Sequence, residues 1–277
     1  MAKKPKLHWS HIDMLMRCPK QYQFRYVDGI VRPPGIALHV GSSVHEAVAD
    51  NMRHKADSGH LLALGDVKER AAASLRKRWD EEGVWMNEDE LARGIENMRG
   101  AAVDEAVSLT AQHHREVAPH IKPISAAHVE RPFVIRTKRP YDIAGTFDEV
   151  EAADIRDTKT SKQGLQRGDV DSSVQFSIYA LAALLDPEIG KEKGHHAFEG
   201  EPGTVDIKVD VLNKKTGKSK TMRTQRDMKA IETALSIVDV YWKFVQTGVF
   251  PPSTNGWWCS SRWCGWHDQC PFFTGRK

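Results

Sequence analysis

The chain has 277 residues, of which 40% are hydrophobic and 28% charged, and its formal net charge at pH 7 is +3. This composition is typical of one globular domain or two small ones, and the mild charge permits nucleic-acid binding without arguing for it. The basic start has no apolar signal core behind it, and the longest apolar run, 178–185, is far too short to span a bilayer. We therefore expect a soluble, intracellular protein.

The first third of the chain is expected to be helical. Residues 9–26 should form one helix, and a second helical region should begin at Ser43 and Glu46, which fit a capping box. From there to about residue 117 the apolar residues recur at helical spacing and prolines are few, which predicts two to four helices.

After residue 126 the apolar pattern alternates, which is typical of strands. The expected strands are 127–137, the run that carries Asp148, 154–160, 204–212 and 219–224, and the expected helices are 172–185 and 228–245. This order predicts an α/β (α+β) fold with a central mixed sheet of about five strands flanked by helices. We expect one domain over 1–277, with a helical insertion at 44–120.

Two of the strand-like runs each supply a carboxylate, Asp148 and Asp157, and the second run adds Lys159 two residues later. Side chains alternate along a strand, so Asp157 and Lys159 should point to the same side. If the two strands pair, the acids and the lysine meet in one place, where they could hold a divalent metal against a phosphodiester. Alone, the triplet fits solvated charges at strand ends equally well.

Gln175 and Tyr179 lie four residues apart on the next expected helix, so they share one face. With them, the chain resembles the PD-(D/E)xK nuclease superfamily, and within it the RecB-like exonucleases, including CRISPR-associated and phage-encoded iron–sulfur members. The family order is a helical histidine, G-x-x-D, D/E-x-K and Q-x-x-x-Y. Here it is His45, Gly145-Thr-Phe-Asp148, Asp157-Thr-Lys159 and Gln175-Phe-Ser-Ile-Tyr179.

The resemblance implies a restriction-endonuclease-like core and a metal site. Asp148 and Asp157 would ligate Mg²⁺ or Mn²⁺, assisted by His45 and the backbone carbonyl of Thr158. Glu130, on the preceding strand, is a weaker candidate for a further ligand or a partner of one.

The remaining motif residues would act beside the metal. Lys159 would orient the attacking water or stabilise charge on the phosphate, and Gln175 and Tyr179 would position Lys159 or the scissile strand. Lys162 and Arg167, in the loop after the catalytic strand, are candidate contacts to the DNA backbone. The pair His113-His114 is interpreted as a solvated helix face.

The cysteines are placed unevenly, since Cys18 stands alone and Cys259, Cys264 and Cys270 crowd the C-terminus. This distribution points to a shared metal ligand that joins Cys18 to a tail region, 251–277. Four thiolates suit zinc. Some RecB-like nucleases instead hold an iron–sulfur cluster with one N-terminal and three C-terminal cysteines, so the resemblance favours a 4Fe–4S cluster with zinc as the alternative. The first gap in the tail is wider than the two-residue gap usual in that family.

Four tryptophans accompany the tail cysteines, and their expected role is to shield the cluster from solvent. Stacking against single-stranded DNA is the alternative. The tryptophans are Trp257, Trp258, Trp263 and Trp266.

These features together predict a metal-dependent DNA exonuclease, acting on linear single-stranded or end-frayed double-stranded DNA in the cytoplasm (of the bacterial host, if phage-encoded). One alternative is an endonuclease or a CRISPR-adaptation nuclease on the same core. Another is a catalytically weak or inactive DNA-binding accessory protein of recombination or replication. The presence of Asp148, Asp157 and Lys159 together weighs against an inactive site.

Overall fold

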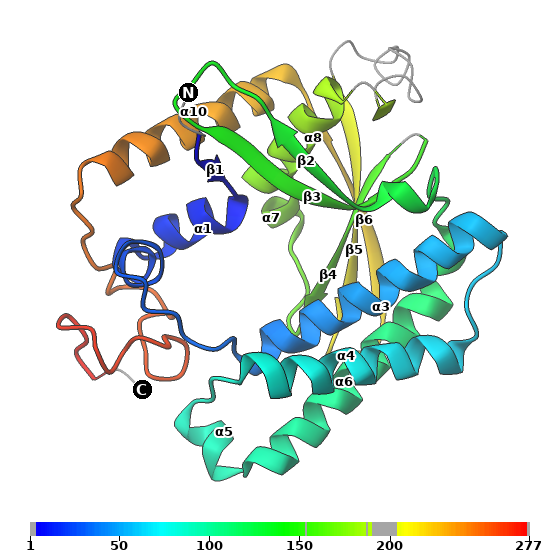
Figure 1. Ribbon diagram of the computed structural model, residues 1–277, viewed down its shortest axis with the longest axis horizontal. Helices are drawn as coiled ribbons and strands as arrows, with labels where there is room; N and C mark the ends of the chain where they lie inside the picture. Colours follow the sequence, from blue (N-terminus) through cyan, green and yellow to red (C-terminus); the bar gives the residue numbers. More distant parts are fainter. Residues whose placement is uncertain (1–3, 153, 187, 190–203, 276–277) are drawn as a thin grey trace.

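A mixed six-stranded sheet between two layers of helices organises the chain in a computed structural model (Figure 1). The structure describes residues 4–152, 154–186, 188–189 and 204–275. The strands are β1 (Lys6–Leu7), β2 (Val129–Ile135), β3 (Asp142–Val150), β4 (Ile155–Ser161), β5 (Val205–Asn213) and β6 (Ser219–Arg226).

The strand order is β1-β3-β4-β5-β6, with β2 also paired to β3. The β2–β3, β3–β4 and β5–β6 pairs are antiparallel, whereas β1–β3 and β4–β5 are parallel. The β3–β4 ladder is short, and its register pairs Glu149 with Arg156 and Val150 with Ile155. Beyond these two pairs the strands separate, so β3 and β4 form a fork inside the sheet.

One face of the sheet is covered by three long helices, α3 (Ile36–Ser58), α4 (Leu64–Glu82) and α6 (Ile95–Glu116), with the short α5 (Glu88–Ala92) at their end (Figure 1). Their apolar side chains form one core cluster that includes Val44, Leu75 and Leu109 and reaches the sheet at Leu212. The apolar spacing at i, i+3 and i+4 that defines these helices thus also determines which side packs inward.

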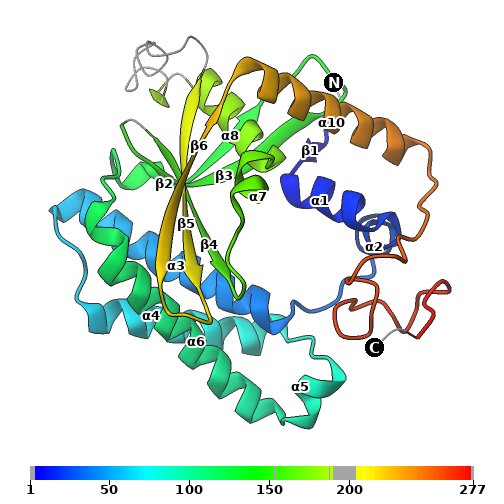
Figure 2. The ribbon, with the colours of Figure 1, turned by 180° about the vertical axis from the view of Figure 1, so that it is seen from behind.

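The opposite face is covered by α1 (Trp9–Arg17), α7 (Arg167–Asp171), α8 (Val174–Leu185) and α10 (Met228–Gln246) (Figure 2). A second core cluster lies there and includes Phe147, Ile178 and Val238. The central strands β3 and β4 are mostly buried because helices cover both faces of the sheet.

The short elements are α2 (Pro19–Tyr22), a π-helical turn (Gln23–Val27) and two 3₁₀ turns (Ala118–His120 and Ala126–His128). Within the part of the chain that the structure describes, no helix combines the length and the apolar character that crossing a membrane requires.

The predicted fold class is confirmed, and the expected sheet of about five strands has a sixth, β1, which is too short to show an alternating pattern. Two details of the prediction are wrong. The first helix is interrupted at Cys18, because Pro19 begins a new turn and cannot continue the hydrogen bonding of α1. Ser43 and Glu46 do not cap a helix: α3 begins at Ile36, Ser43 is fully buried, and Glu46 accepts hydrogen bonds from Ser74 and Arg78 of α4.

Candidate active site

Three neighbouring strands each bring one carboxylate to the same level of the sheet. The β2–β3 register pairs Val129 with Glu149 and Arg131 with Phe147, which places Glu130 opposite Asp148. Continuing the β3–β4 register past Glu149 and Arg156 places Asp148 opposite Asp157. The fork between β3 and β4 opens at this point, so the acids lie where the ladder leaves space.

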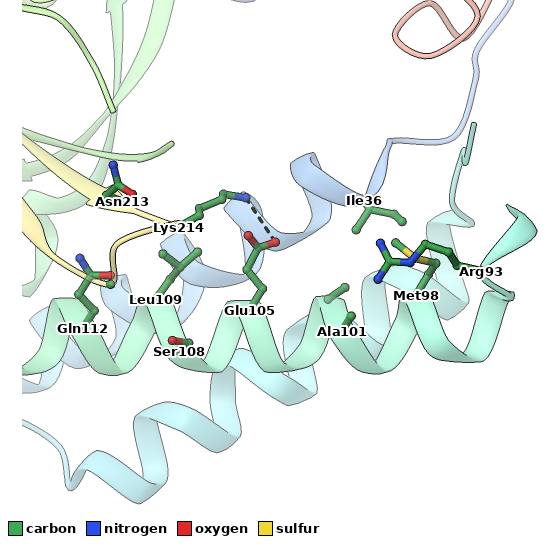
Figure 3. A pocket seen from close by; sticks show the side chains of 12 residues that line it. Ile36, Arg93, Met98, Ala101, Glu105, Ser108, Leu109, Gln112, Asn213 and Lys214 are labelled. Carbon is green, nitrogen blue, oxygen red and sulfur yellow. Dashed lines mark ion pairs between the residues drawn. The ribbon is translucent and has the colours of Figure 1, made fainter. Parts of the chain in front are cut away.

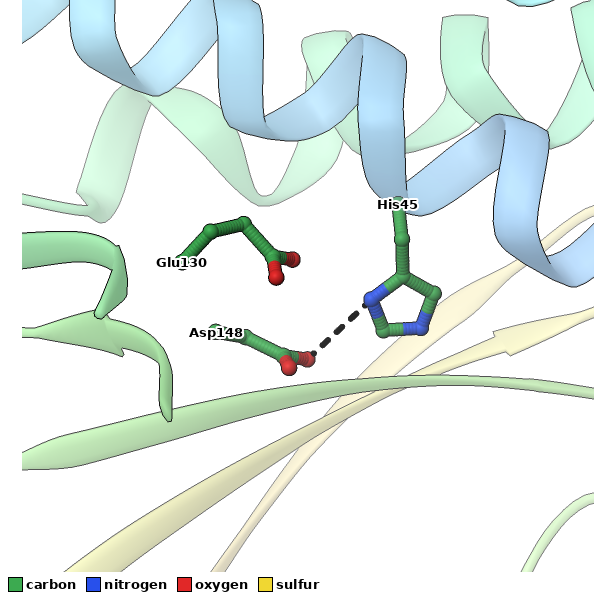
Figure 4. Close-up of side chains that lie close together, drawn as sticks. All are labelled: His45, Glu130 and Asp148. Carbon is green, nitrogen blue, oxygen red and sulfur yellow. Dashed lines mark ion pairs between the residues drawn. The ribbon is translucent and has the colours of Figure 1, made fainter. Parts of the chain in front are cut away.

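His45 of α3 approaches these acids from the helical layer. Its Nδ1 lies 3.3 Å from Asp148 Oδ2, and one ligand atom each from His45, Glu130 and Asp148 lie within 4.8 Å of one another (Figure 4). The three side chains line an open pocket of about 620 Å³. One imidazole nitrogen with carboxylate oxygens is a donor set that fits Mn²⁺ or Mg²⁺.

Glu130 is held in an unusual backbone conformation, with φ at 50° near the start of β2. A non-glycine residue in the left-handed region carries strain, and such strain concentrates at functional sites. Burial, and then repulsion from Asp148, raise the pKa of the Glu130 carboxyl to about 7. A divalent cation between the two carboxylates would relieve that repulsion.

Asp157 is fully buried and is paired with the lysine of its own strand. Lys159 Nζ lies 3.0 Å from Asp157 Oδ2 and donates a hydrogen bond to Oδ1 over 3.1 Å. The two side chains therefore do share one side of β4, as strand alternation predicts. Burial raises the pKa of Asp157 to about 6, opposed by the attraction of Lys159 and assisted by repulsion from Asp148. Asp157 lies outside the set of three ligand atoms around His45.

The backbone of Thr158 holds the side chain of Asp148 in place. Its N–H donates a hydrogen bond to Asp148 Oδ2 over 2.8 Å. This contact fixes the Asp148 carboxylate across the mouth of the fork, between β4 and His45. The role of the Thr158 carbonyl as a metal ligand stays a prediction.

Gln175 and Tyr179 lie on one face of α8, and Gln175 Nε2 donates to Tyr179 Oη over 2.9 Å. The Tyr179 ring packs edge-on against Phe133 and Phe147 of the sheet. Burial, and then the charges of Asp157 and Asp148, raise its pKa well above the usual value. In the described part of the chain neither side chain hydrogen-bonds Lys159, so their positioning role remains a prediction.

The pocket also holds two arginines that the sequence reasoning missed. Arg53 and Arg78 line it beside His45. Arg53 could have been found from its spacing, because it lies two helical turns after His45 on the same face of α3. Arg78 comes from α4, and no local pattern places it near the acids.

A separate pocket of about 370 Å³ lies between α6 and the turn that joins β5 to β6 (Figure 3). Glu105 is the one acidic residue among its lining side chains, and it is 3.6 Å from Lys214. The pocket therefore offers one carboxylate, which already has a cationic partner, and its lining holds no cluster of acids for a metal. The acid-lined pocket at His45 is the candidate active site.

The other polar residues singled out from the sequence differ in their surroundings. Lys162 is exposed after β4, whereas the guanidinium of Arg167 is paired with Asp171 at 2.7 Å. The interpretation of His113 and His114 as a solvated face is wrong. His113 is fully buried and its ring nitrogens have no hydrogen-bond partner among the described residues, and His114 Nε2 lies 2.9 Å from the Leu62 carbonyl oxygen. Both histidines lie where α6 packs against the rest of the protein. The occurrence of two adjacent histidines in the sequence does not predict this packing.

The four cysteines meet although Cys18 is more than 240 positions before the others. Cys18, at the break between α1 and α2, lines one small pocket together with Cys259, Cys264 and Cys270. Gln21 Nε2 donates a hydrogen bond to Cys264 Sγ over 3.3 Å, and the Ser253 N–H donates to Cys18 Sγ over 3.5 Å. Such contacts are typical of thiolates that bind a metal.

The tail tryptophans differ in burial, and Trp258 is half-buried. Trp266 is buried against Cys264 and Phe24, and its indole N–H donates to the Ile30 carbonyl. Trp257 and Trp263 are instead 63% and 55% exposed. The expectation that all four shield the cysteines is therefore wrong for these two.

An acid cluster with a histidine in the fork of a mixed sheet, and a lysine on the adjoining strand, define a metal-dependent nuclease. The sequence matches the PD-(D/E)XK nuclease superfamily over residues 7–271, and the chain belongs to that family. Its fold is accordingly the α/β restriction-endonuclease-like fold, and its substrate class is DNA. No curated protein matches the chain.

Proposed function

We propose that the protein is a metal-dependent DNA exonuclease whose metal is Mg²⁺ or Mn²⁺. The observation that carries the proposal is the convergence of Glu130, Asp148 and Asp157 at one level of the sheet, opposite His45. His45, Glu130 and Asp148 would hold the metal, with Asp157 and the Thr158 carbonyl as further ligands. A bound divalent ion lowers the pKa of a coordinated water and offsets charge on the phosphate.

The chain's own residues have separate tasks in this proposal. Asp157 holds the Lys159 ammonium, and Lys159 orients the attacking water and stabilises the charge that builds on the phosphate. Burial lowers the pKa of Lys159, but the charges of Asp157 and Asp148 outweigh it, and the net direction is upward. The lysine therefore acts as a cation. Tyr179, held by the hydrogen bond from Gln175, would position Lys159 or the scissile strand.

The exonuclease assignment, rather than an endonuclease, is supported by the ordered motifs that resemble the RecB-like exonucleases. The test is digestion of end-labelled linear DNA and of closed circular DNA with Mg²⁺ or Mn²⁺. Linear DNA should be degraded and circles should remain intact. Degradation of circles would overturn the exonuclease assignment and leave a nuclease.

The catalytic assignment has its own test, the substitutions Asp157→Asn and Lys159→Met. Each should reduce cleavage of linear DNA by at least 100-fold, on the order of the loss when a group that stabilises the transition state is removed. Asp206→Asn, which neutralises an exposed acid on β5, is the matched control and should retain activity. If Asp157→Asn and Lys159→Met cleave like the control, the site assignment is wrong and an accessory DNA-binding role is favoured.

We further propose that the four cysteines hold a 4Fe–4S cluster. Four thiolates on one zinc lie about 3.8 Å apart, as bond lengths of about 2.3 Å in a tetrahedron require. No three of these cysteines bring their sulfurs within 4.8 Å of one another. A cluster suits wider spacing because each thiolate binds a different iron. It would tie the first helices to the tail, and its bonds would add to folding free energy.

A further inference from the structure

A second open pocket, of about 810 Å³, lies beside the catalytic strand and is separate from the metal site. Its walls are Ser161 at the end of β4, the following loop residues 162–164, and Lys215 in the turn between β5 and β6. The cysteine-rich tail closes the other side with Trp257, Arg262 and Trp263. The proposed nuclease chemistry uses none of these side chains.

The pocket carries positive charge only. Lys162, Lys215 and Arg262 line it, all three are exposed, and no carboxylate is among its lining residues. Arg262 lies 4.0 Å from Asp89, which is itself exposed, so this contact does not neutralise the guanidinium in a tight pair. Three cations without acids are complementary to the phosphates of a nucleic acid.

Two large aromatic surfaces accompany these cations. Trp257 and Trp263 are 63% and 55% exposed, with ring centroids 5.3 Å apart and planes at 83°. The guanidinium of Arg262 lies 5.7 Å from the centre of the Trp263 ring, which holds both side chains by a cation–π contact. Exposed tryptophans next to basic side chains are the combination that binds unpaired bases by stacking.

The pocket and the catalytic residues lie along the same strand. Asp157, Lys159 and Ser161 are two residues apart in succession, so they lie on one side of β4. Ser161, on the pocket wall, is four residues from Asp157, or roughly 13 Å along the strand. A DNA strand bound in the pocket would therefore need to extend only along β4 to reach the catalytic residues.

We propose that this pocket binds single-stranded DNA, with Trp257 and Trp263 stacking on bases and Lys162, Lys215 and Arg262 contacting phosphates. The proposal rests on the nuclease function proposed above and specifies the substrate as a DNA end with an unpaired strand. Duplex DNA does not fit this role, because its bases are stacked on one another and cannot meet the indole faces.

The test measures binding of a fluorescein-labelled oligothymidylate by anisotropy, with Ca²⁺ in place of Mg²⁺ and the oligonucleotide shown intact afterwards. Trp257→Ala and Trp263→Ala should each raise the dissociation constant roughly 5- to 100-fold, since each stacked base contributes on that scale. Trp→Phe at either position should keep most of the affinity. Phe272→Ala, at an exposed aromatic of the same tail outside the pocket, is the control and should change nothing.

A second measurement does not depend on the tryptophans or on tail folding. Lys215→Ala should reduce the slope of log affinity against log salt by about 0.7, the value for one phosphate contact on a single strand. Lys229→Ala, an exposed lysine on α10, should leave the slope unchanged. If a Trp→Ala variant loses the metal proposed for the tail cysteines, the Trp→Phe variants and Lys215→Ala still test whether the pocket binds single-stranded DNA.

Three results would overturn the proposal. They are unchanged oligothymidylate binding by both Trp→Ala variants, an unchanged salt slope for Lys215→Ala, and an equal loss of duplex and single-strand binding in the variants. The last result would indicate general contact with the phosphate backbone. The nuclease assignment fails by a different observation, namely continued cleavage by Asp157→Asn, so the two failures are distinguishable.

Discussion

His45 Nδ1 lies 3.3 Å from Asp148 Oδ2, and this contact joins the long helix α3 to the central strand β3. More than 100 residues separate the two in sequence, and the helices α4, α5 and α6 lie between them. The helical layer therefore supplies part of the proposed metal site in addition to covering one face of the sheet. Alterations that shift α3 should change metal binding even when the sheet is intact.

The structure makes Glu130 a stronger candidate metal ligand than the sequence alone indicates, because it groups Glu130 with His45 and Asp148. Glu130→Gln should weaken Mn²⁺ binding roughly 10- to 100-fold, as removal of an oxygen donor at or beside a metal does. Isothermal titration calorimetry measures the affinity. Glu46→Gln is the matched control, because Glu46 lines the same pocket but lies outside the set of His45, Glu130 and Asp148. Equal weakening in both variants would indicate a general charge effect.

The proposed 4Fe–4S cluster predicts that the protein contains iron and that its stability depends on that iron. Protein purified without oxygen should be brown, with a broad visible absorbance that bleaches on reduction. Cys18→Ser and Cys264→Ser should each lower the iron content and the midpoint of thermal unfolding, because metal–thiolate bonds contribute to folding. Ser253→Ala, at a residue of the same pocket, should retain the iron. Stoichiometric zinc without iron would contradict the cluster and leave the nuclease proposal intact.

The buried side chain of His113 is expected to lower the free energy of unfolding as the pH falls. Burial, and then the charge of Arg156, lower its pKa to about 3 in the folded protein, whereas it is 6.5 in the unfolded chain. Between these values the unfolded state binds the extra proton, so the free energy of unfolding falls as pH decreases below 6.5. The slope is at most about 1.4 kcal/mol per pH unit.

His113→Leu should remove this contribution, and denaturant unfolding from pH 7 to pH 4 measures it. The wild-type protein should lose stability relative to the variant as pH falls. Comparing the two proteins is essential because Glu149, whose pKa burial raises well above normal, acts in the opposite direction. Parallel pH profiles of wild type and variant would contradict the prediction.

Gly145, the glycine of the G-x-x-D motif, has a packing role. A Cβ atom there would lie 2.5 Å from Cζ and 2.9 Å from Cε1 of Phe133. Gly145→Ala should therefore cost about 1–3 kcal/mol of stability, as overpacking of a core does. Gly100→Ala in α6, where nothing lies within 4 Å, should instead stabilise by about 0.5–1 kcal/mol. Thermal and urea unfolding measure the stability of both variants against the wild type. A Gly145→Ala protein as stable as the wild type would show that Phe133 moves aside.

Local sequence patterns predicted the longer helices and the longer strands, because apolar spacing is a property of neighbouring residues. Strand β4 was expected at 154–160 and is Ile155–Ser161. Where two local signals competed, prediction failed. Ser43 and Glu46 satisfied a capping pattern inside a helix that the apolar residues from Ile36 already continue, and the burial of helix α3 decided between them.

By itself the sequence determined the fold class and the spacing of Asp157 and Lys159, since alternation along one strand needs no partner. The tertiary structure alone decided that Glu130 lies beside Asp148, because that neighbourhood depends on the register between strands. It also decided that Trp257 and Trp263 are exposed while Trp266 is buried. Burial depends on what the tail packs against, and residues distant in sequence, such as Phe24 and Ile30, provide that surface.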